Sequence, residues 1–367
     1  MNFIFIIFGV RSPPAGSSKD NFAKPQPRPQ PHSPYVLLTK CTFLNKFNFF
    51  LSSLLLSFLT FTSCNTFSSV SSEREDRIWG GKPAAFASVE AVEPLWLEFA
   101  DGVDYFHGKI TSPKLEFWAL RVDLSSPKIR IVVKGGMADN DTGSADLAEL
   151  RLNAVLSTKV TAFVRDNNLI AGVNALPFDK ISSREGRPIQ NMGIVISDGK
   201  IIAPANTRYD AVVFYRDGGQ IKAAIVSQSD IQSAALPAKF PAANIQNAAG
   251  GFYQILAGGE TTERTRNVDA RHPRSAAGVS PNGSRLYLLV IDGRRSGSVG
   301  ATEGETALLL RSLGSWDGLN FDGGGSSALA LRGSDSKIRT VNTPIHARIP
   351  GMERAVAGCV GVAADEE

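Results

Sequence analysis

The chain has 367 residues, of which 43% are hydrophobic and 20% are charged, and its net charge is +4. This composition is typical of a globular protein with a substantial core, and the length allows one large domain or two ordinary ones. Lys and Arg form no dense cluster outside the N-terminal region, so the sequence argues against nucleic acid as a partner.

Residues 1–63 have the pattern of an export signal rather than of a folded domain. A Pro-rich polar run is followed by two lysines, by an apolar run at 47–61, and by small residues before Cys64. Basic, apolar and small segments in this order are typical of a secretory signal. The apolar run is too short to span a bilayer comfortably. We therefore expect a leader and signal peptide that the mature protein lacks, with translation starting near residues 39–44.

The residues before Cys64 resemble the lipobox of bacterial lipoproteins. Cys64 would then be a lipid-carrying N-terminus, followed by a Ser-, Asn- and Glu-rich tether over residues 64–77. The predicted location is the bacterial cell envelope, where the lipid on Cys64 would anchor the protein in the membrane. The alternative is an ordinary signal peptide, or an anchor helix with an incidental cysteine. Cys41 would leave with the signal and Cys359 lies in an apolar run, so no disulfide or zinc site is predicted.

Residues 78–367 are expected to form one domain in which strands outnumber helices. Asp-Gly and Asn-Gly dipeptides between apolar runs are typical of hairpin turns. The predicted fold class is α+β, a single domain with an extensive mixed or antiparallel sheet and a few helices. In chain order, the expected elements are strands at 94–99, 117–124 and 128–134, helices at 144–158 and 159–168, hairpin turns at Asp198-Gly199, Asp217-Gly218 and Asn282-Gly283, and a helix at 302–314.

The helix at 302–314 has the clearest end signals. Thr302 and Glu305 form a T-x-x-E capping box, in which each side chain accepts a bond from the other residue's amide. Gly314 follows at the position where a left-handed residue commonly ends a helix. Thr302 and Glu305 therefore receive structural roles, and Glu303 is expected to be an exposed acid that the helix dipole favours.

The stretch NFDGGGSSALAL, residues 320–331, carries the strongest sign of a functional site. A predicted strand ends at Asp322, and three glycines follow. Glycine readily adopts the positive φ that lets successive amides converge on an anion, and two serines add hydroxyl donors. The stretch thus predicts a carboxylate beside an anion-binding loop; the alternative is a tight turn that Asp322 caps. The residues expected to bind substrate here are Gly323, Gly324, Gly325, Ser326 and Ser327.

Three upstream side chains are further candidates. Arg274 is expected to hold phosphate, because a guanidinium binds phosphate bidentately and keeps its charge; a surface salt bridge is the alternative. His272 is either a proton donor or a loop cap. Asp292 ends an apolar strand before a glycine, so it is either a turn former or a second carboxylate that works with Asp322.

Together these motifs resemble the phosphodiester glycosidase family over roughly residues 117–364. The H-P-R-S and D-G-G-G-S-S elements are specific in combination, whereas either alone would be weak. The resemblance assigns Asn174, within IAGVNALPFD, and Arg294 to substrate binding. The matching elements are His272 to Ser275, Asp292-Gly293-Arg294, Ser298 to Glu305, Leu313-Gly314, and Asp322 to Ser327.

The resemblance implies hydrolysis of the glycosidic C–O bond of a sugar 1-phosphate diester in an envelope or extracellular glycan. A phosphomonoester leaves as a stable anion, so the site should depend on fixed positive potential more than on a tuned general acid. Our hypothesis is that Asp322 or Asp292 is the nucleophile or the water-activating base at the anomeric carbon. Arg274 and the glycine loop would hold the phosphate.

Two other functions stay open at this point. A lipid-anchored envelope protein could use the same loop to bind a glycan or an anionic polymer without cleaving it. A phosphodiesterase would cleave on the phosphorus side, which usually needs metal ligands, and His107, His272 and His346 show no metal-binding spacing. No cofactor or metal is therefore expected, and oxygen-ligated calcium near the Asp-rich loops is the alternative.

Overall fold

The computed structural model describes residues 74–134, 154–233, 245–266 and 270–364. All of them belong to a compact unit, Ser57–Glu367; the other unit, Met1–Leu56, lies outside the described residues. The expected signal peptide and the lipidation site at Cys64 lie outside them as well. Within the described ranges, no helix is long and apolar enough to cross a bilayer.

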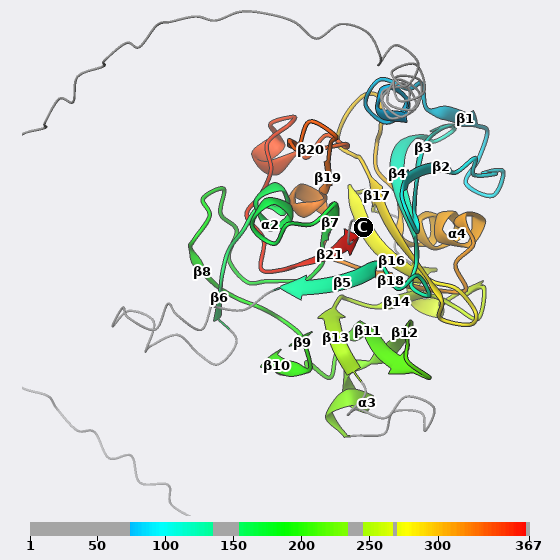
Figure 1. The fold of residues 1–367 in the computed structure, drawn as a ribbon. Helices are drawn as coiled ribbons and strands as arrows, with labels where there is room; N and C mark the ends of the chain where they lie inside the picture. Colours follow the sequence, from blue (N-terminus) through cyan, green and yellow to red (C-terminus); the bar gives the residue numbers. More distant parts are fainter. Residues whose placement is uncertain (1–73, 135–153, 234–244, 267–269, 365–367) are drawn as a thin grey trace, which may run out of the picture. The chain divides into compact units, whose positions relative to one another are not determined.

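Strands dominate the described part of the chain, with few helices (Figure 1). Nine of the described strands form one large sheet in the order β1-β3-β4-β17-β16-β18-β14-β15, with β2 also on β3. Its pairs are antiparallel except β1 with β3. The strands are β1 (Ala84–Phe86), β2 (Leu97–Ala100), β3 (Val103–Thr111), β4 (Lys114–Asp123), β14 (Gln254–Ala257), β15 (Glu260–Thr261), β16 (Arg274–Val279), β17 (Arg285–Ile291) and β18 (Asp317–Asn320).

Smaller antiparallel sheets complete the described strands. One has the order β10-β9-β13-β11-β12, with β9 (Val195–Ser197), β10 (Lys200–Ala203), β11 (Asp210–Asp217), β12 (Gln220–Ser227) and β13 (Ile245–Gly250). Another has the order β20-β19-β7-β21-β5, with β5 (Ile129–Lys134), β7 (Ala171–Asn174), β19 (Leu329–Arg332), β20 (Ile338–Thr340) and β21 (Cys359–Ala364). A ribbon pairs β6 (Ala154–Leu156) with β8 (Pro188–Gln190).

The helices are short, and their caps explain where they begin. In α4 (Glu303–Leu313), the predicted capping box between Thr302 and Glu305 is present, and Gly314 ends the helix with φ 108°, so these predictions are confirmed. The first turn of α2 (Val160–Asp166) is capped from a distant segment, because Glu353 accepts the amide of Thr161 at 3.0 Å. Other helices in the described residues include α3 (Gln228–Gln232), η3 (Glu263–Thr265), η4 (Gly324–Ser326) and η5 (His346–Arg348).

Most elements that local signals predicted are present. The strands at 117–124 and 128–134 and the helix at 159–168 correspond to β4, β5 and α2, and β2 covers the end of the strand expected at 94–99. The Asp198-Gly199 turn joins β9 to β10, and the Asn282-Gly283 turn joins β16 to β17, as expected.

One predicted helix is wrong, and one predicted hairpin is present with its turn displaced by one residue. The helix expected at 144–158 is a strand at Ala154–Leu156, where it pairs with β8, and its residues 144–153 lie outside the described ones. The turn expected at Asp217-Gly218 lies one position later. Asp217 still pairs with Gln220, and Gly218 and Gly219 adopt φ 58° and 88°, which a two-residue type I′ turn requires.

The large sheet is buried on both faces, which explains its continuous apolar strands. Side chains of β17 alternate between two core clusters: Leu286, Leu288 and Val290 belong to one, and Tyr287, Leu289 and Ile291 to the other. The first cluster also contains side chains of β5, β7 and β21, and the second contains those of α4. Figure 1 shows α4 on one side of this sheet and β5, β7 and β21 on the other. Polar groups therefore gather at the strand ends.

Candidate active site

The sheet brings the predicted motifs together at one edge. Because β16 pairs antiparallel with β17 and with β18, its first residue lies level with the last residues of both neighbours. Arg274 is opposite Ile291, and Ala276 is opposite Asn320. The amide of Gly324 donates to the carbonyl of Pro273 at 2.8 Å. The H-P-R-S, D-G-R and D-G-G-G-S-S segments thus meet, although they are far apart in sequence.

Asp322 lies just past β18, with its backbone fixed on both sides. Its amide donates to the carbonyl of Ala175 at 2.8 Å, and its carbonyl accepts the side-chain amide of Asn174 at 2.6 Å. Burial raises the pKa of the Asp322 carboxyl to about 6, against the opposing effects of the Ser326 hydroxyl, the Arg354 charge and the Gly323 amide. A carboxyl group with this pKa is mostly ionised at pH 7, and its pKa lies close to that pH.

Two guanidinium groups lie against the glycine loop. A Cβ on Gly324, whose φ is 64°, would be 3.0 Å from Nη2 of Arg294, and a Cβ on Gly325 would be 2.5 Å from Nη2 of Arg354. Arg354 also donates to the Ser326 hydroxyl at 3.2 Å. Burial lowers the pKa of Arg354, which the Asp322 charge raises and the Arg294 charge lowers. Asp322, Arg294 and Arg354 are therefore electrostatic neighbours, and the glycines provide the space for the arginines.

Most of the loop amides that were expected to converge on an anion instead donate hydrogen bonds to backbone carbonyls. Gly324, Ser326 and Ser327 donate their amides to the carbonyls of Pro273, Gly323 and Gly324 at 2.8, 3.2 and 3.4 Å. The last two bonds belong to the turn of η4. The expectation of an amide cradle is therefore wrong for these three groups, and the positive potential at the loop comes from arginine side chains.

Two imidazoles accompany these arginines. Nδ1 of His272 is 3.5 Å from Nη2 of Arg294, and Nδ1 of His346 accepts Nε of Arg354 at 3.2 Å. Burial lowers the pKa of both imidazoles, and neighbouring arginine charges lower it further. Both rings are therefore neutral at pH 7.

Backbone strain marks the same edge. Arg294 has φ 59°, and Ala347 and Arg348, which follow His346, have φ 52° and 64°. Non-glycine residues adopt such angles rarely, and these angles cluster at functional sites because the surrounding structure must hold them.

Arg274 is more enclosed than its predicted role requires. It is 7% exposed, and its guanidinium donates to the carbonyls of Ala301 at 3.0 Å and Ala270 at 3.1 Å, and to Glu303 at 3.3 Å. These bonds tie the chain before β16 to the start of α4. Glu303 is paired and only 14% exposed, so its prediction as an exposed acid is wrong. Phosphate binding by Arg274 stays a prediction that these contacts do not favour.

Asn174 is fully buried and both ends of its amide are used. Besides the bond to Asp322, its Oδ1 accepts the Ser275 hydroxyl at 2.7 Å and the Ala328 amide at 3.1 Å. The residue joins β7, β16 and the chain before β19. Its predicted direct contact with substrate stays a prediction that this burial does not favour; in the structure the side chain positions Asp322.

Asp292 is 1% exposed and its carboxylate is saturated with donors. Oδ1 accepts the Asn342 side chain at 3.0 Å and the Thr343 amide at 3.1 Å, and Oδ2 accepts Arg295. Arg295 also pairs with Glu116 at 3.2 Å. Burial raises the pKa of Asp292 to about 6. The segments of Asp292 and Asp322 share an edge, but in the described residues no side chain bonds both carboxylates.

Two members of the site escaped the sequence analysis, Arg354 and His346. Arg354 precedes the apolar run of β21, and its neighbour Glu353 caps α2, which fixes this segment. A single arginine before a strand is too common to single out. Only the pairing of β21 with β7 brings it near Asp322.

Two cavities of about 560 and 270 Å³ lie by the β16–β17 turn, where they share Ser280, Pro281 and Asn282. That turn is at the end of β17 opposite Asp292. With seven residues in β17, the two ends are about 20 Å apart. The carboxylate of Asp322 is therefore remote from these cavities. Among the described residues, no group of three or more His, Cys, Asp or Glu side chains could hold a metal ion.

A family model described as phosphodiester glycosidase matches residues 167–363, a range that includes every residue of the candidate site. No curated protein matches the chain. The fold is similar to a crystal structure of a Burkholderia pseudomallei protein classed as exported, at 17% identity and a TM-score of 0.50, over 68% of this chain and 74% of that one.

Two further solved structures are similar at lower TM-scores. A hypothetical protein from Synechocystis has 16% identity and a TM-score of 0.49, over 75% of this chain; this chain spans 64% of that protein's length. The catalytic domain of zebrafish N-acetylglucosamine-1-phosphodiester alpha-N-acetylglucosaminidase, auto-inhibited by its pro-peptide, has 20% identity and a TM-score of 0.49, over 76% of this chain and 87% of that domain.

Proposed function

Because the chain belongs to the phosphodiester glycosidase family, whose model matches more than half of it, we propose that it hydrolyses the glycosidic C–O bond of a sugar 1-phosphate diester. The observation that supports this most is the group at the glycine loop. One carboxylate with a pKa raised to about 6 lies beside two guanidinium groups, Arg294 and Arg354.

The proposed reaction divides the substrate between these groups. Arg294 and Arg354 hold the phosphate, and Asp322 faces the anomeric carbon. Asp322 either attacks that carbon, forming a glycosyl ester that water then hydrolyses, or takes a proton from the attacking water. In either case the C–O bond breaks, and its electron pair goes to the phosphate oxygen, where negative charge grows next to fixed positive charge. The leaving phosphomonoester is already a stable anion, so little general-acid assistance is needed.

The remaining residues of the site receive supporting roles in this proposal. His346 orients Arg354 through the bond from Nε to Nδ1, and His272 lies beside Arg294 and is the candidate for a proton shuttle. Arg274 and Asp292 position the site, the first by tying the chain to α4 and the second by holding residues 342–343. No cofactor is proposed.

Hydrolysis of a sugar 1-phosphate diester in ¹⁸O-labelled water tests this proposal. Label in the sugar product indicates cleavage of the C–O bond, as proposed. Label in the phosphate product would identify a phosphodiesterase that attacks phosphorus. Binding of the diester without turnover would identify a binding protein, and either result would overturn the proposal.

We also propose that the protein is exported and carries lipid on Cys64. The support is the order of basic, apolar and small residues before Cys64, together with a structural neighbour classed as exported. Mass spectrometry of the mature protein decides this, because the proposal predicts an N-terminal Cys64 with attached acyl chains. An unmodified Cys64 inside a chain that starts at Met1 would contradict it.

A further inference from the structure

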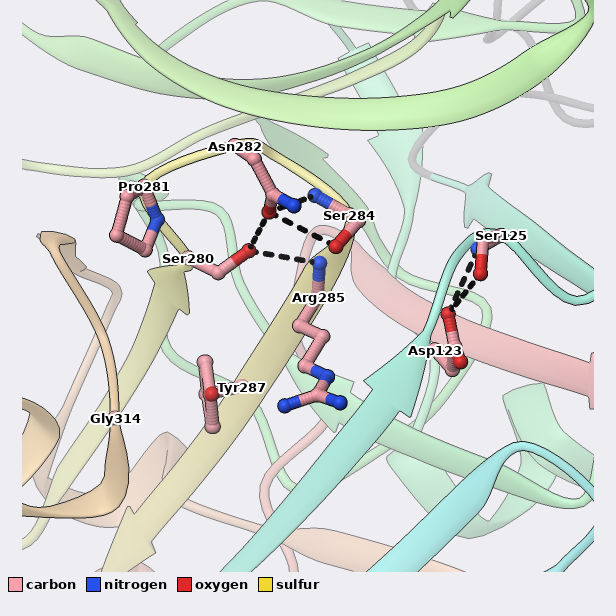
Figure 2. A pocket seen from close by; sticks show the side chains of 9 residues that line it. All are labelled: Asp123, Ser125, Ser280, Pro281, Asn282, Ser284, Arg285, Tyr287 and Gly314. Carbon is pink, nitrogen blue, oxygen red and sulfur yellow. Dashed lines mark hydrogen bonds between the residues drawn. The ribbon is translucent and has the colours of Figure 1, made fainter.

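The cavity of about 560 Å³ has a lining that the proposed reaction does not use (Figure 2). It is formed by the end of β4, the start of β17, the turn between β16 and β17, and Gly314 after α4. Its volume lies within the range of small-molecule sites, about 300–1,000 Å³. What it could bind depends on which of its polar groups are free.

Arg285 places an unpaired guanidinium in this cavity. Asp123 lies directly opposite it on β4, but the carboxylate of Asp123 instead accepts the amide and the hydroxyl of Ser125 at 3.0 and 2.6 Å. Among the described residues, the Arg285 side chain has no hydrogen bond or ion pair. Figure 2 shows the Arg285 side chain between Tyr287 and Asp123. The Arg285 guanidinium and the Asp123 carboxylate thus line the same cavity without forming an ion pair.

Tyr287 contributes a hydroxyl without a protein partner in the described residues. The residue is 4% exposed, and within the described chain its hydroxyl has no hydrogen-bond partner. A Cβ on Gly314 would lie 2.7 Å from that oxygen, so the glycine leaves room for it. Tyr287 lines the cavity, so this hydroxyl can donate a hydrogen bond to a ligand there.

The turn supplies a third free donor on the rim. Oδ1 of Asn282 accepts the hydroxyls of Ser280 and Ser284, both at 2.9 Å, and the amide of Ser284 at 3.1 Å. These bonds fix the side chain of Asn282 and leave its NH₂ group without a partner in the described residues. Figure 2 shows the hydrogen-bonded turn of Ser280, Asn282 and Ser284 at one side of the cavity and the Asp123–Ser125 pair at another.

We propose that this cavity binds a phosphorylated sugar. The free donors of Arg285, Tyr287 and Asn282 suit the oxygens of a phosphate group. The free carboxylate oxygen of Asp123 would repel a bare anion but accepts bonds from sugar hydroxyls. The site is distinct from Asp322, about 20 Å away along β17, and the proposal does not depend on the reaction proposed above.

Calorimetric titration of the full chain tests the phosphate contact. The parent protein is an Arg294→Met/Arg354→Met variant, which removes the guanidinium groups of the candidate active site. We expect one site for glucose 1-phosphate, and Arg285→Met in this background weakens binding at least about tenfold. Arg187→Met, which removes an exposed arginine outside the cavity, is the matched control and leaves binding unchanged. Equal affinity in the Arg285 and Arg187 variants would overturn the proposal.

Inorganic phosphate and glucose are the other two titrants. We expect glucose 1-phosphate to bind more tightly than either one, and Asp123→Asn to weaken the sugar phosphate more than inorganic phosphate. Equal binding of phosphate and glucose 1-phosphate would overturn the sugar contact. Arg285→Met in the otherwise native chain leaves diester hydrolysis unchanged, so the result does not depend on whether the proposed function is correct.

Discussion

Asp322 is the residue on which the proposed chemistry depends most. Asp322→Asn removes the charge with almost no change of shape, so the fold should persist. We expect kcat to fall at least about 10²-fold, the low end of a general acid–base contribution. Steady-state kinetics together with the thermal midpoint check this. A variant that keeps more than about a tenth of the wild-type kcat would remove Asp322 from the mechanism.

The raised pKa of Asp322 predicts the pH dependence of the reaction. Its carboxyl must be ionised to act as a nucleophile or base, and its pKa is about 6. The value of kcat/KM should therefore rise with pH up to about 6 and level off above it. The lowered pKa values of His272 and His346 keep both rings neutral above pH 6.5, so they add no decline there. An acidic limb whose midpoint lies below pH 4 would contradict the assignment.

Variants of Asp292 test whether its carboxylate has a structural or a catalytic role. Asp292→Ala leaves Arg295, Asn342 and the Thr343 amide without their buried acceptor. We expect a loss of about 2–5 kcal/mol in the free energy of unfolding, measured with urea. If instead this variant is as stable as wild type and Asp292→Asn abolishes turnover, Asp292 is a catalytic residue.

At the scale of single residues, sequence could predict Asp322 and the glycines but not their partners. Local pattern identifies an acid at a strand end followed by three glycines. Arg354 joins them only through strand pairing, which local pattern does not encode. Arg274 illustrates the reverse case: its motif position was clear, but its buried contacts with Ala301 and Ala270 depend on how α4 packs.

At the scale of elements, the glycine loop has no room for a larger residue beside Arg354, which gives a testable prediction. Gly325→Ala adds a Cβ that would lie 2.5 Å from Nη2 of Arg354. The guanidinium must move, so we expect kcat/KM to fall at least about tenfold with little change in stability. Gly297→Ala is the matched control, because nothing lies within 4 Å of its Cβ. Equal kinetics of the two variants would show that the position of Arg354 is unimportant.

Elements with strong local signals were the predictable ones. α4 has a capping box and a terminal glycine, and the β16–β17 hairpin has Asn-Gly between apolar runs. Ala154–Leu156 forms a strand because pairing with β8 overrides a weak helical pattern. The turn of η4 uses the amides that were expected to bind an anion, and only the backbone geometry could show this.

At the scale of the whole molecule, strand order assembles the site. The order β4-β17-β16-β18 with antiparallel pairing places the start of β16 beside the ends of β17 and β18. A sequence with several strands allows many such orders, so the meeting of the motifs could be expected only from the family resemblance. The same topology places the β16–β17 turn and its cavities at the other end of the sheet.

The central claim is that arginines at the glycine loop stabilise a leaving phosphate. Arg354→Met tests it most directly when two substrates of the same sugar are compared, one a phosphodiester and one with a neutral phenol as leaving group. We expect kcat/KM for the phosphodiester to fall at least about 10²-fold, because charge on the phosphate grows toward the transition state. The phenyl glycoside should lose less than about threefold, since its leaving group carries no phosphate. Equal losses on both substrates would show that Arg354 supports the fold or the sugar, and would contradict the claim.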